Sequence, residues 1–274
     1  MAALSLLLDD ASLAEHYERV SADHQFKSGQ KLLAALGIAR GEQVLDVGCG
    51  TGLLAEHAAA LVGPSGRAVG VDPLPERIRL AQRRTRGNLE YAVGDAYDLS
   101  RFPDLSFDAA YLNAVFHWLP DKAEPLAQLH RVLKPRGRLG IWTIAKDHPS
   151  RIRTIKDQVC GREPYVRIAA PQAGGPQPVS VAELETLVRA AGFEPSTIEV
   201  KHNEISLPSA SEAIDFIESS SFGNFLGHLP EPLRAAAREE IREELERGRT
   251  PAGIPLSGAS IVAIAFKRWV LGGR

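Results

Sequence analysis

The sequence is poor in cysteine and its histidines are scattered. Its 274 residues include two cysteines, Cys49 and Cys160, and eight histidines. The cysteines stand far apart and outside any Cys-x-x-Cys spacing, which argues against a disulfide framework or a zinc site and fits a reducing compartment. We therefore expect no bound metal.

Signals for membranes and nucleic acids are also missing. No apolar stretch approaches the ~20 residues that span a bilayer, and residues 4–8 lack the basic flank and length of a signal peptide. The 32 Lys and Arg residues against 34 Asp and Glu residues give a formal net charge of -2, so nothing points to a polyanionic partner. These absences predict a cytoplasmic protein without nucleic-acid or membrane partners.

A glycine-rich turn follows a short apolar run. Residues 44–52 read Val-Leu-Asp-Val-Gly-Cys-Gly-Thr-Gly. This pattern predicts a buried strand, a turn with glycines at alternate positions, and a helix whose apolar positions begin at Leu54. The unpaired N–H groups at the start of such a helix suit a carboxylate or a phosphate.

The spacing of the glycines distinguishes among loops of this kind. A dinucleotide fingerprint, Gly-x-Gly-x-x-Gly, needs a third glycine where this chain has Leu53, and no Gly-Lys-Ser/Thr follows for a Walker loop. The pattern Asp-x-Gly-x-Gly-x-Gly resembles the first motif of the Rossmann-like (class I) methyltransferases that use S-adenosylmethionine (SAM). The resemblance implies SAM as the cofactor, with the loop beneath its methionine part.

Two further acids follow expected strands. Asp72 ends the run 67–72 and lies 72 − 52 = 20 residues beyond Gly52. This spacing suits a carboxylate that accepts hydrogen bonds from both ribose hydroxyls. Alternatively, Asp72 could simply cap the next helix. In the family resembled, an acid placed like Asp95 accepts from the adenine amine and the next N–H, here of Ala96, meets the ring. The expected cofactor residues are Asp46, Gly48, Cys49, Gly50, Thr51, Gly52, Asp72, Pro73, Asp95, Ala96 and Asn113.

The segment 113–121, Asn-Ala-Val-Phe-His-Trp-Leu-Pro-Asp, follows a fourth expected strand. It resembles the trans-aconitate methyltransferases and their relatives, which include the malonyl-carrier-protein methyltransferase of biotin synthesis. The join Leu-Lys-Pro-Arg-Gly at 133–137 is another feature of SAM methyltransferases. The resemblance runs from about residue 40 to the end of the chain and is weakest at 145–179.

The resemblance implies an α/β fold: a Rossmann-like, seven-stranded, mostly parallel sheet with an antiparallel final strand, helices on both faces and a small helical cap. Later strands are expected at 138–143, near 196–200 and at 259–267, and Asp121 with Glu124 and Ser180 with Glu183 are expected as capping boxes. We divide the chain into an N-terminal helical segment (1–40), a SAM-binding core (41–145), an insertion (146–179) and the rest of the core (180–274), with the helical cap at about 205–250.

His117 is the candidate catalytic residue. Methyl transfer from a sulfonium needs a positioned nucleophile and, if that nucleophile is protonated, a base, and imidazole can accept a proton near neutral pH. Trans-aconitate-like enzymes commonly have glutamine here because a carboxylate acceptor is already ionised, so His117 could instead orient the acceptor or pack in the cap. The residues expected around the substrate are Tyr17, Phe116, His117, Trp118, His148 and Arg151. The basic residues Lys146, His148, Arg151 and Arg153 would offset the charge of a carboxylate acceptor.

The resemblance therefore implies a SAM-dependent methyltransferase that acts on a small-molecule acceptor, with O-methylation as the default and a monomer or homodimer as the assembly. Alternatives are a binding protein that keeps the SAM fold, a non-methylating enzyme such as a cyclase and, with less support, an NAD-dependent oxidoreductase.

Overall fold

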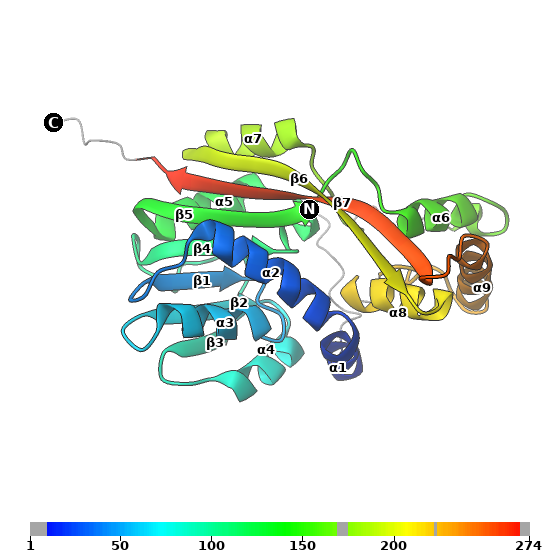
Figure 1. The fold of residues 1–274 in the computed structure, drawn as a ribbon, viewed down its shortest axis with the longest axis horizontal. Coiled ribbons are helices and arrows are strands. Elements are labelled where there is room, and N and C mark those ends of the chain that lie inside the picture. The colour runs from blue at the N-terminus through cyan, green and yellow to red at the C-terminus, as the bar shows by residue number, and fades with distance from the viewer. Residues whose placement is uncertain (1–9, 169–174, 222–223, 269–274) are drawn as a thin grey trace.

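A single sheet organises the protein. The computed structural model describes residues 10–168, 175–221 and 224–268, and these residues form a seven-stranded sheet in the order β3-β2-β1-β4-β5-β7-β6 (Figure 1). All neighbouring pairs are parallel except those of β7, which is antiparallel to both β5 and β6. The fold class expected from the sequence is confirmed.

The elements alternate along the chain. The strands are β1 (Gln43–Val47), β2 (Arg67–Asp72), β3 (Leu89–Val93), β4 (Phe107–Asn113), β5 (Leu133–Ile144), β6 (Phe193–Leu207) and β7 (Ile254–Lys267). The helices are α1 (Ala11–Val20), α2 (Ala22–Leu36), α3 (Leu53–Val62), α4 (Pro75–Ala81), α5 (Ala123–Val132), α6 (Arg151–Cys160), α7 (Val181–Ala190), α8 (Ala210–Ser220) and α9 (Leu233–Glu246). Short 3-10 turns are η2 (Gln82–Arg84), η3 (Phe116–Trp118) and η4 (Tyr165–Arg167).

The order of the strands reverses next to β1. The chain builds outward from β1 through β2 to β3 and then returns to place β4 on the other side of β1. In an open parallel sheet, such a reversal opens a crevice at the carboxyl ends of the strands, where the two neighbouring connections leave toward opposite faces. The glycine-rich turn after β1 lies at this point.

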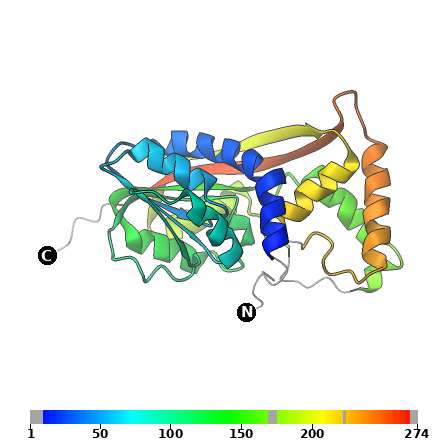
Figure 2. The ribbon, with the colours of Figure 1, turned by 90° about the horizontal axis from the view of Figure 1, so that it is seen from below.

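Helices cover both faces of the sheet (Figures 1 and 2). Apolar residues of α2, α3 and α4 pack on one face, with Leu32, Ala58 and Ile78 among them. The other face is covered by α5 and α7 through residues such as Leu129 and Leu184. Burial on both sides explains why β1, β2 and β4 read as nearly continuous apolar runs in the sequence.

Beyond the sheet, β6 and β7 continue together as a two-stranded ribbon that carries the cap. β5 pairs with β7 only from Arg138↔Phe266 to Ile144↔Ser260, whereas β6 follows β7 to Leu207↔Ile254. Around this ribbon, α6, α8 and α9 share a separate apolar cluster, seen as the smaller lobe in Figure 1. The helices α8 and α9 fall within the cap range expected from the sequence, while α6 comes from the insertion.

The N-terminal helices join this cap to the core. α1 stands between the core and α8 (Figure 2), and Ser21, at the junction of α1 and α2, has its hydroxyl 2.5 Å from that of Ser219. The Ser21 hydroxyl also donates to the Phe216 carbonyl at 3.2 Å. The N-terminal helices therefore bridge the two lobes.

Several local expectations need correction. Asp121 and Glu124 do not form a capping box: Lys122 is the N-cap of α5, and the Asp121 carboxylate accepts from the backbone of Ala123. The Ser180–Glu183 capping box is present at α7.

β5, β6 and β7 are all longer than expected, because pairing with a long neighbour extends a strand past the apolar run that marks it in the sequence. Part of the insertion, 169–174, lies outside the described residues.

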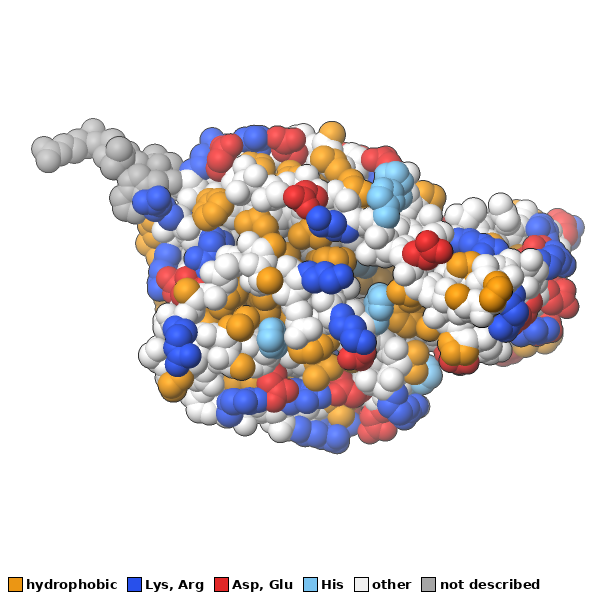
Figure 3. Space-filling model, in the orientation of Figure 1, with side chains coloured by type: hydrophobic (Ala, Val, Ile, Leu, Met, Phe, Trp, Pro, Cys, Tyr) orange, Lys and Arg blue, Asp and Glu red, His pale blue; other side chains and the backbone are white. Residues whose placement is uncertain are grey.

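Charges of both signs are interspersed over the face shown in Figure 3. Charged side chains of the protein also form short-range pairs along helices, such as Arg242 with Glu239 on α9 and Arg189 with Glu185 on α7. Exposed pairs of this kind contribute little to stability. Within the described residues, no helix is long and apolar enough to cross a membrane.

The packing around Gly70 in β2 leaves no room for a side chain. A Cβ at this position would lie 2.8 Å from Tyr91 Cδ1 and 2.9 Å from Cys49 Cβ, whereas a Cβ at Gly87 would meet nothing within 4 Å. We expect Gly70→Ala to lower the free energy of unfolding by about 1–3 kcal/mol through overpacking, measured by urea denaturation. Gly87→Ala is the matched control and should be neutral or slightly stabilising; an equal effect of both changes would contradict this packing account.

Candidate active site

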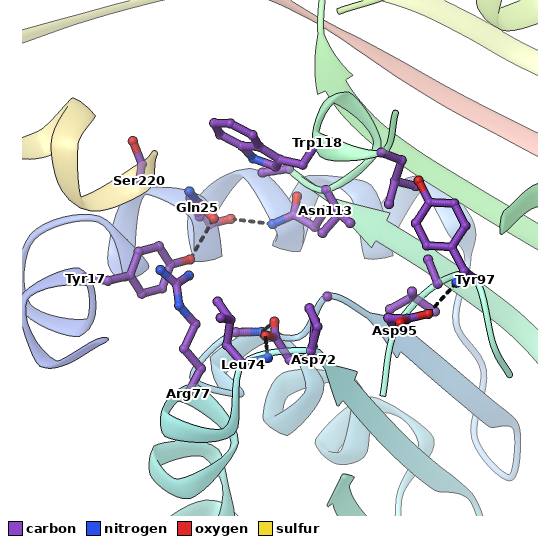
Figure 4. Close-up of a pocket in the computed structure, with 18 of the residues that line it drawn as sticks. Tyr17, Gln25, Asp72, Leu74, Arg77, Asp95, Tyr97, Asn113, Trp118 and Ser220 are labelled. Carbon is purple, nitrogen blue, oxygen red and sulfur yellow. Dashed lines mark hydrogen bonds between the residues drawn. The ribbon is translucent and has the colours of Figure 1, made fainter. Parts of the chain in front are cut away.

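The carboxyl ends of β1 to β4 surround a cavity of about 370 Å³. Its lining includes polar side chains from successive strand ends, among them Asp72, Asp95 and Asn113 (Figure 4). Pro73 and Ala96 from the sequence-based set also line it. The parallel sheet therefore brings together strand ends that are up to 66 positions apart in the sequence (113 − 47 = 66), because Val47 at the end of β1 also lines the cavity.

The glycines of the turn have different roles. A Cβ at Gly48 would lie 2.2 Å from Val115 Cγ2, and one at Gly52 would lie 2.7 Å from the Tyr91 ring, so both glycines are required by the packing of the protein itself. Gly50 is different, because its nearest neighbours are atoms of the Tyr17 ring at 3.7 Å. Gly48 and Gly50 line the cavity, whereas Gly52, also expected to contact the cofactor, does not.

Asp72 ties the glycine turn to the start of α4. Its buried carboxylate accepts from the backbone N–H of Gly50 at 2.8 Å through Oδ2 and from that of Leu74 at 3.0 Å through Oδ1. The Leu74 contact closes the turn before α4, but Asp72 does not cap this helix: the N-cap is Leu74, and no side chain forms a cap hydrogen bond there. The Asp72 carboxylate also lines the cavity.

Asp95 organises the turn after β3. Its Oδ1 accepts from the N–H groups of Tyr97 at 2.7 Å and Asp98 at 3.0 Å. These bonds fix the carboxylate at the wall of the cavity opposite Tyr17 (Figure 4) and leave Oδ2 for a ligand.

The N-terminal helices form the other wall of the cavity. The Tyr17 hydroxyl donates to Gln25 Oε1 at 2.7 Å, and Arg77 lies over the Tyr17 ring at 4.2 Å from its centroid. Asn113 Nδ2 donates to the Gln25 carbonyl at 3.1 Å (Figure 4). Among the described residues, none donates to Asn113 Oδ1, which is buried. That oxygen is an unused acceptor at the cavity wall.

Three predicted cofactor residues line a separate small space beside the first cavity. Asp46, Cys49 and Thr51 line a small space of about 30 Å³ that also touches Asn113. Tyr111 donates to Asp46 Oδ2 at 2.9 Å, yet burial raises the pKa of Asp46 to about 8. Burial also raises the pKa of the Cys49 thiol well above its usual range, so this cysteine is not a reactive thiolate.

A second cavity of about 200 Å³ adjoins the first, between the core and the cap. The two cavities share the lining residues Gln25, Asn113, Ala114, Trp118 and Ser220. The second cavity is further lined by His117, His148 and Arg153. Its apolar walls come from both lobes, with Trp142 on the sheet and Phe216 on α8.

His117 is buried at this second cavity. Its Nδ1 lies 3.2 Å from Thr143 Oγ1. Burial, together with the positive charges of Arg153 and Lys122, lowers the pKa of His117 to about 3. The imidazole is therefore neutral at physiological pH and only weakly basic.

Two residues expected around the substrate are elsewhere. Phe116 is fully buried in the core between the sheet and α5, and Arg151 does not line either cavity. Phe116 was misplaced because the 3-10 turn η3 directs neighbouring side chains to opposite sides. Tyr17, Trp118 and His148 do line the cavities, as His117 does.

Several lining residues were absent from the sequence-based set, namely Gln25, Arg77, Trp142 and Ser220. Of the four basic residues expected to offset the charge of a carboxylate acceptor, His148 and Arg153 line the second cavity, whereas Lys146 and Arg151 do not. Nothing in the sequence singles out Gln25 or Ser220. Among the residues that the structure describes, no cluster of three His, Cys, Asp or Glu side chains could hold a metal ion.

Comparison with known proteins identifies the family. A profile of the methyltransferase domain matches residues 45–141. Nocamycin O-methyltransferase of Saccharothrix syringae is 30% identical over 282 residues, covering 93% of this chain and 95% of that protein. Trans-aconitate 2-methyltransferase of Methylobacterium nodulans is 27% identical, covering 91% of this chain and 93% of that protein.

The fold agrees with these matches. A SAM-dependent methyltransferase of Aquifex aeolicus superposes with a TM-score of 0.52 at 21% identity, covering 69% of this chain and 91% of that one. For two other curated relatives the matched region spans only 39% and 58% of their lengths. With a match along nearly all of a 30% identical methyltransferase, this chain belongs to the class I SAM-dependent methyltransferases.

Proposed function

We propose that the protein transfers a methyl group from SAM, bound in the first cavity, to an oxygen atom of a small molecule bound in the second. The observation that carries this proposal is the shared boundary of the two cavities at Asn113, Trp118 and Ser220. A cofactor in the first cavity and an acceptor in the second would meet at this boundary, which is what direct methyl transfer requires. The near full-length similarity to nocamycin O-methyltransferase favours oxygen as the acceptor atom.

The residues of the first cavity fit SAM. Asp72 supplies a buried carboxylate for two ribose hydroxyls, and Asp95 Oδ2 can accept from the amine of adenine. The unused acceptor Asn113 Oδ1 suits the ammonium of the methionine part, with Asp46 beneath it. When bound, SAM would supply an electrophilic methyl group on a positively charged sulfur, with S-adenosylhomocysteine as the leaving group.

The chain's own contribution is to position the acceptor and exclude water. Helices α1 and α2 close one side of the cavities through Tyr17 and Gln25, and α8 closes the other through Ser220. The neutral His117 can orient the acceptor by a hydrogen bond. Its low basicity makes a role as general base unfavourable, so we assign it an orienting role.

Asp72→Ala should weaken SAM binding by about 1.5–3 kcal/mol, because two ribose hydroxyls lose a charged acceptor. Isothermal titration calorimetry with SAM measures this effect. Asp104→Ala is the control, since its exposed carboxylate pairs with Arg131 on the surface, and it should bind SAM normally. Unchanged affinity in Asp72→Ala would refute the assignment of Asp72 to the ribose.

SAM binding should release a proton from Asp46. Its pKa of about 8 keeps the carboxyl mostly protonated at pH 7 in the free protein, and a nearby ammonium favours the ionised form. Affinity should therefore rise with pH up to about 8. Calorimetry at pH 7 in buffers of different ionisation enthalpy should give a release approaching one proton, which Asp46→Asn abolishes. The same proton release in wild type and variant would contradict this role.

His117→Gln should reduce turnover by less than about tenfold, far below the ~10²–10⁴ expected on removing a general base. Because the imidazole stays neutral above about pH 3, the turnover of wild type and variant should be equally independent of pH between 6 and 9. Steady-state kinetics with any acceptor found by screening measures this. A loss above a hundredfold, with a wild-type pKa that the variant lacks, would establish the general base instead.

A further inference from the structure

A polar cluster beside the glycine-rich turn joins three segments that are far apart in the sequence. Glu18 of α1 accepts hydrogen bonds through both of its carboxylate oxygens, one from the Thr51 hydroxyl and one from Arg84 Nη2. Arg84, in η2, also donates through Nε to the Thr51 carbonyl at 3.1 Å. Glu18, Thr51 and Arg84 thus form a closed triangle in which each residue is hydrogen-bonded to the other two.

This triangle is partly shielded from water. Thr51 is buried, and the side chains of Arg84 and Glu18 are 25% and 29% exposed. A third donor of Arg84, Nη1, lies 3.3 Å from Glu56 Oε2 on α3. The guanidinium therefore donates to three acceptors at once. Charge-assisted hydrogen bonds in such surroundings are stronger than the exposed ion pairs of the surface.

Helix α1 has few apolar anchors of its own. Of its 10 residues, all of them described, Ala14 and Tyr17 are buried. An isolated helix of this length is marginal in water, so the place of α1 on the core depends on its contacts with other segments. Its ion pair with α4, between Glu15 and Arg79, is 4.0 Å long and about half exposed. Glu18 is therefore the stronger of these two polar ties.

The triangle lies next to residues that line the first cavity. Tyr17 directly precedes Glu18, and Gly50 directly precedes Thr51. The Tyr17 ring faces the cavity (Figure 4), and its edge lies 3.7 Å from the place that a Cβ at Gly50 would take. Glu18, Thr51 and Arg84 are not among the described residues that line this cavity. The triangle can therefore affect a ligand in the cavity only through its neighbours.

We propose that Glu18 is a positioning residue for cofactor binding: by bridging Thr51 and Arg84 it holds α1 against the glycine-rich turn and keeps Tyr17 at the wall of the first cavity. The inference rests on the proposed function, because it takes the first cavity as the SAM site. Without Glu18, α1 would occupy this place in only a fraction of the molecules. The apparent affinity for the cofactor falls by that fraction, although no contact with the cofactor itself is removed.

The test measures the affinity of the full chain for S-adenosylhomocysteine by isothermal titration calorimetry. Glu18→Met removes the two acceptors of the triangle at similar size, and Arg84→Met removes its cation. Glu15→Met is the matched control, because Glu15 lies on the same helix in the exposed pair with Arg79. Each change is also made together with Tyr17→Ala. Urea denaturation of every variant shows whether it is folded.

We expect Glu18→Met and Arg84→Met each to raise the dissociation constant roughly 10- to 100-fold, and Glu15→Met to leave it within about twofold of wild type. In the Tyr17→Ala background, where the ring is already missing, Glu18→Met should change the dissociation constant by less than about twofold, as expected of residues that act through one another. Backbone amides of residues 11–20 should exchange with deuterium faster in free Glu18→Met than in free wild type.

Wild-type affinity in Glu18→Met or Arg84→Met, an equal loss from Glu18→Met with and without Tyr17, or unchanged exchange in α1 overturns the proposal. If Glu18→Met does not fold, Arg84→Met and its combination with Tyr17→Ala decide by the same criteria. If wild type binds no S-adenosylhomocysteine, the proposed function has failed and this inference fails with it. If wild type binds it and the variants bind it equally tightly, only the present inference has failed.

Discussion

The hydrogen bonds of the Asp72 carboxylate hold the site together. One oxygen accepts from Gly50 in the turn after β1 and the other from Leu74 before α4, so a single side chain fixes two adjacent crossover connections of the parallel sheet. Because Gly48 and Gly52 are occupied in packing against Val115 and Tyr91, the turn has little freedom to adopt another shape. The first cavity is therefore preorganised by groups that also serve the fold.

The second cavity depends on longer-range structure. It exists because the β6–β7 ribbon leaves the sheet and carries α6 and α8 back over the ends of β4 and β5. The Ser21 hydroxyl then joins the N-terminal helices to α8. Residues from the beginning, middle and end of the chain thus enclose the second cavity, where we propose that the acceptor binds.

Burial gives the titratable groups of the site unusual protonation states. It raises the pKa of Asp46 to about 8 and lowers that of His117 to about 3, so both groups are largely neutral at pH 7 in the free protein. Arg153 remains a cation despite its surroundings. The site therefore has one strong positive charge where the acceptor is proposed to bind, and acids where SAM is proposed to bind.

The sequence alone placed the glycine turn and the strands that end in Asp72 and Asp95, because these are local patterns, and the fold class followed from the family resemblance that these motifs carry. Local patterns also indicated the Ser180 capping box, but they misplaced Phe116 and Arg151 and overlooked Gln25 and Ser220. Only the tertiary structure decided the boundary between the cavities, the burial that neutralises His117 and the surroundings of Arg153. All three features depend on which segments meet between the core and the cap. The residues that bury His117 and surround Arg153 are far apart in the chain, so no local pattern in the sequence indicates their contact.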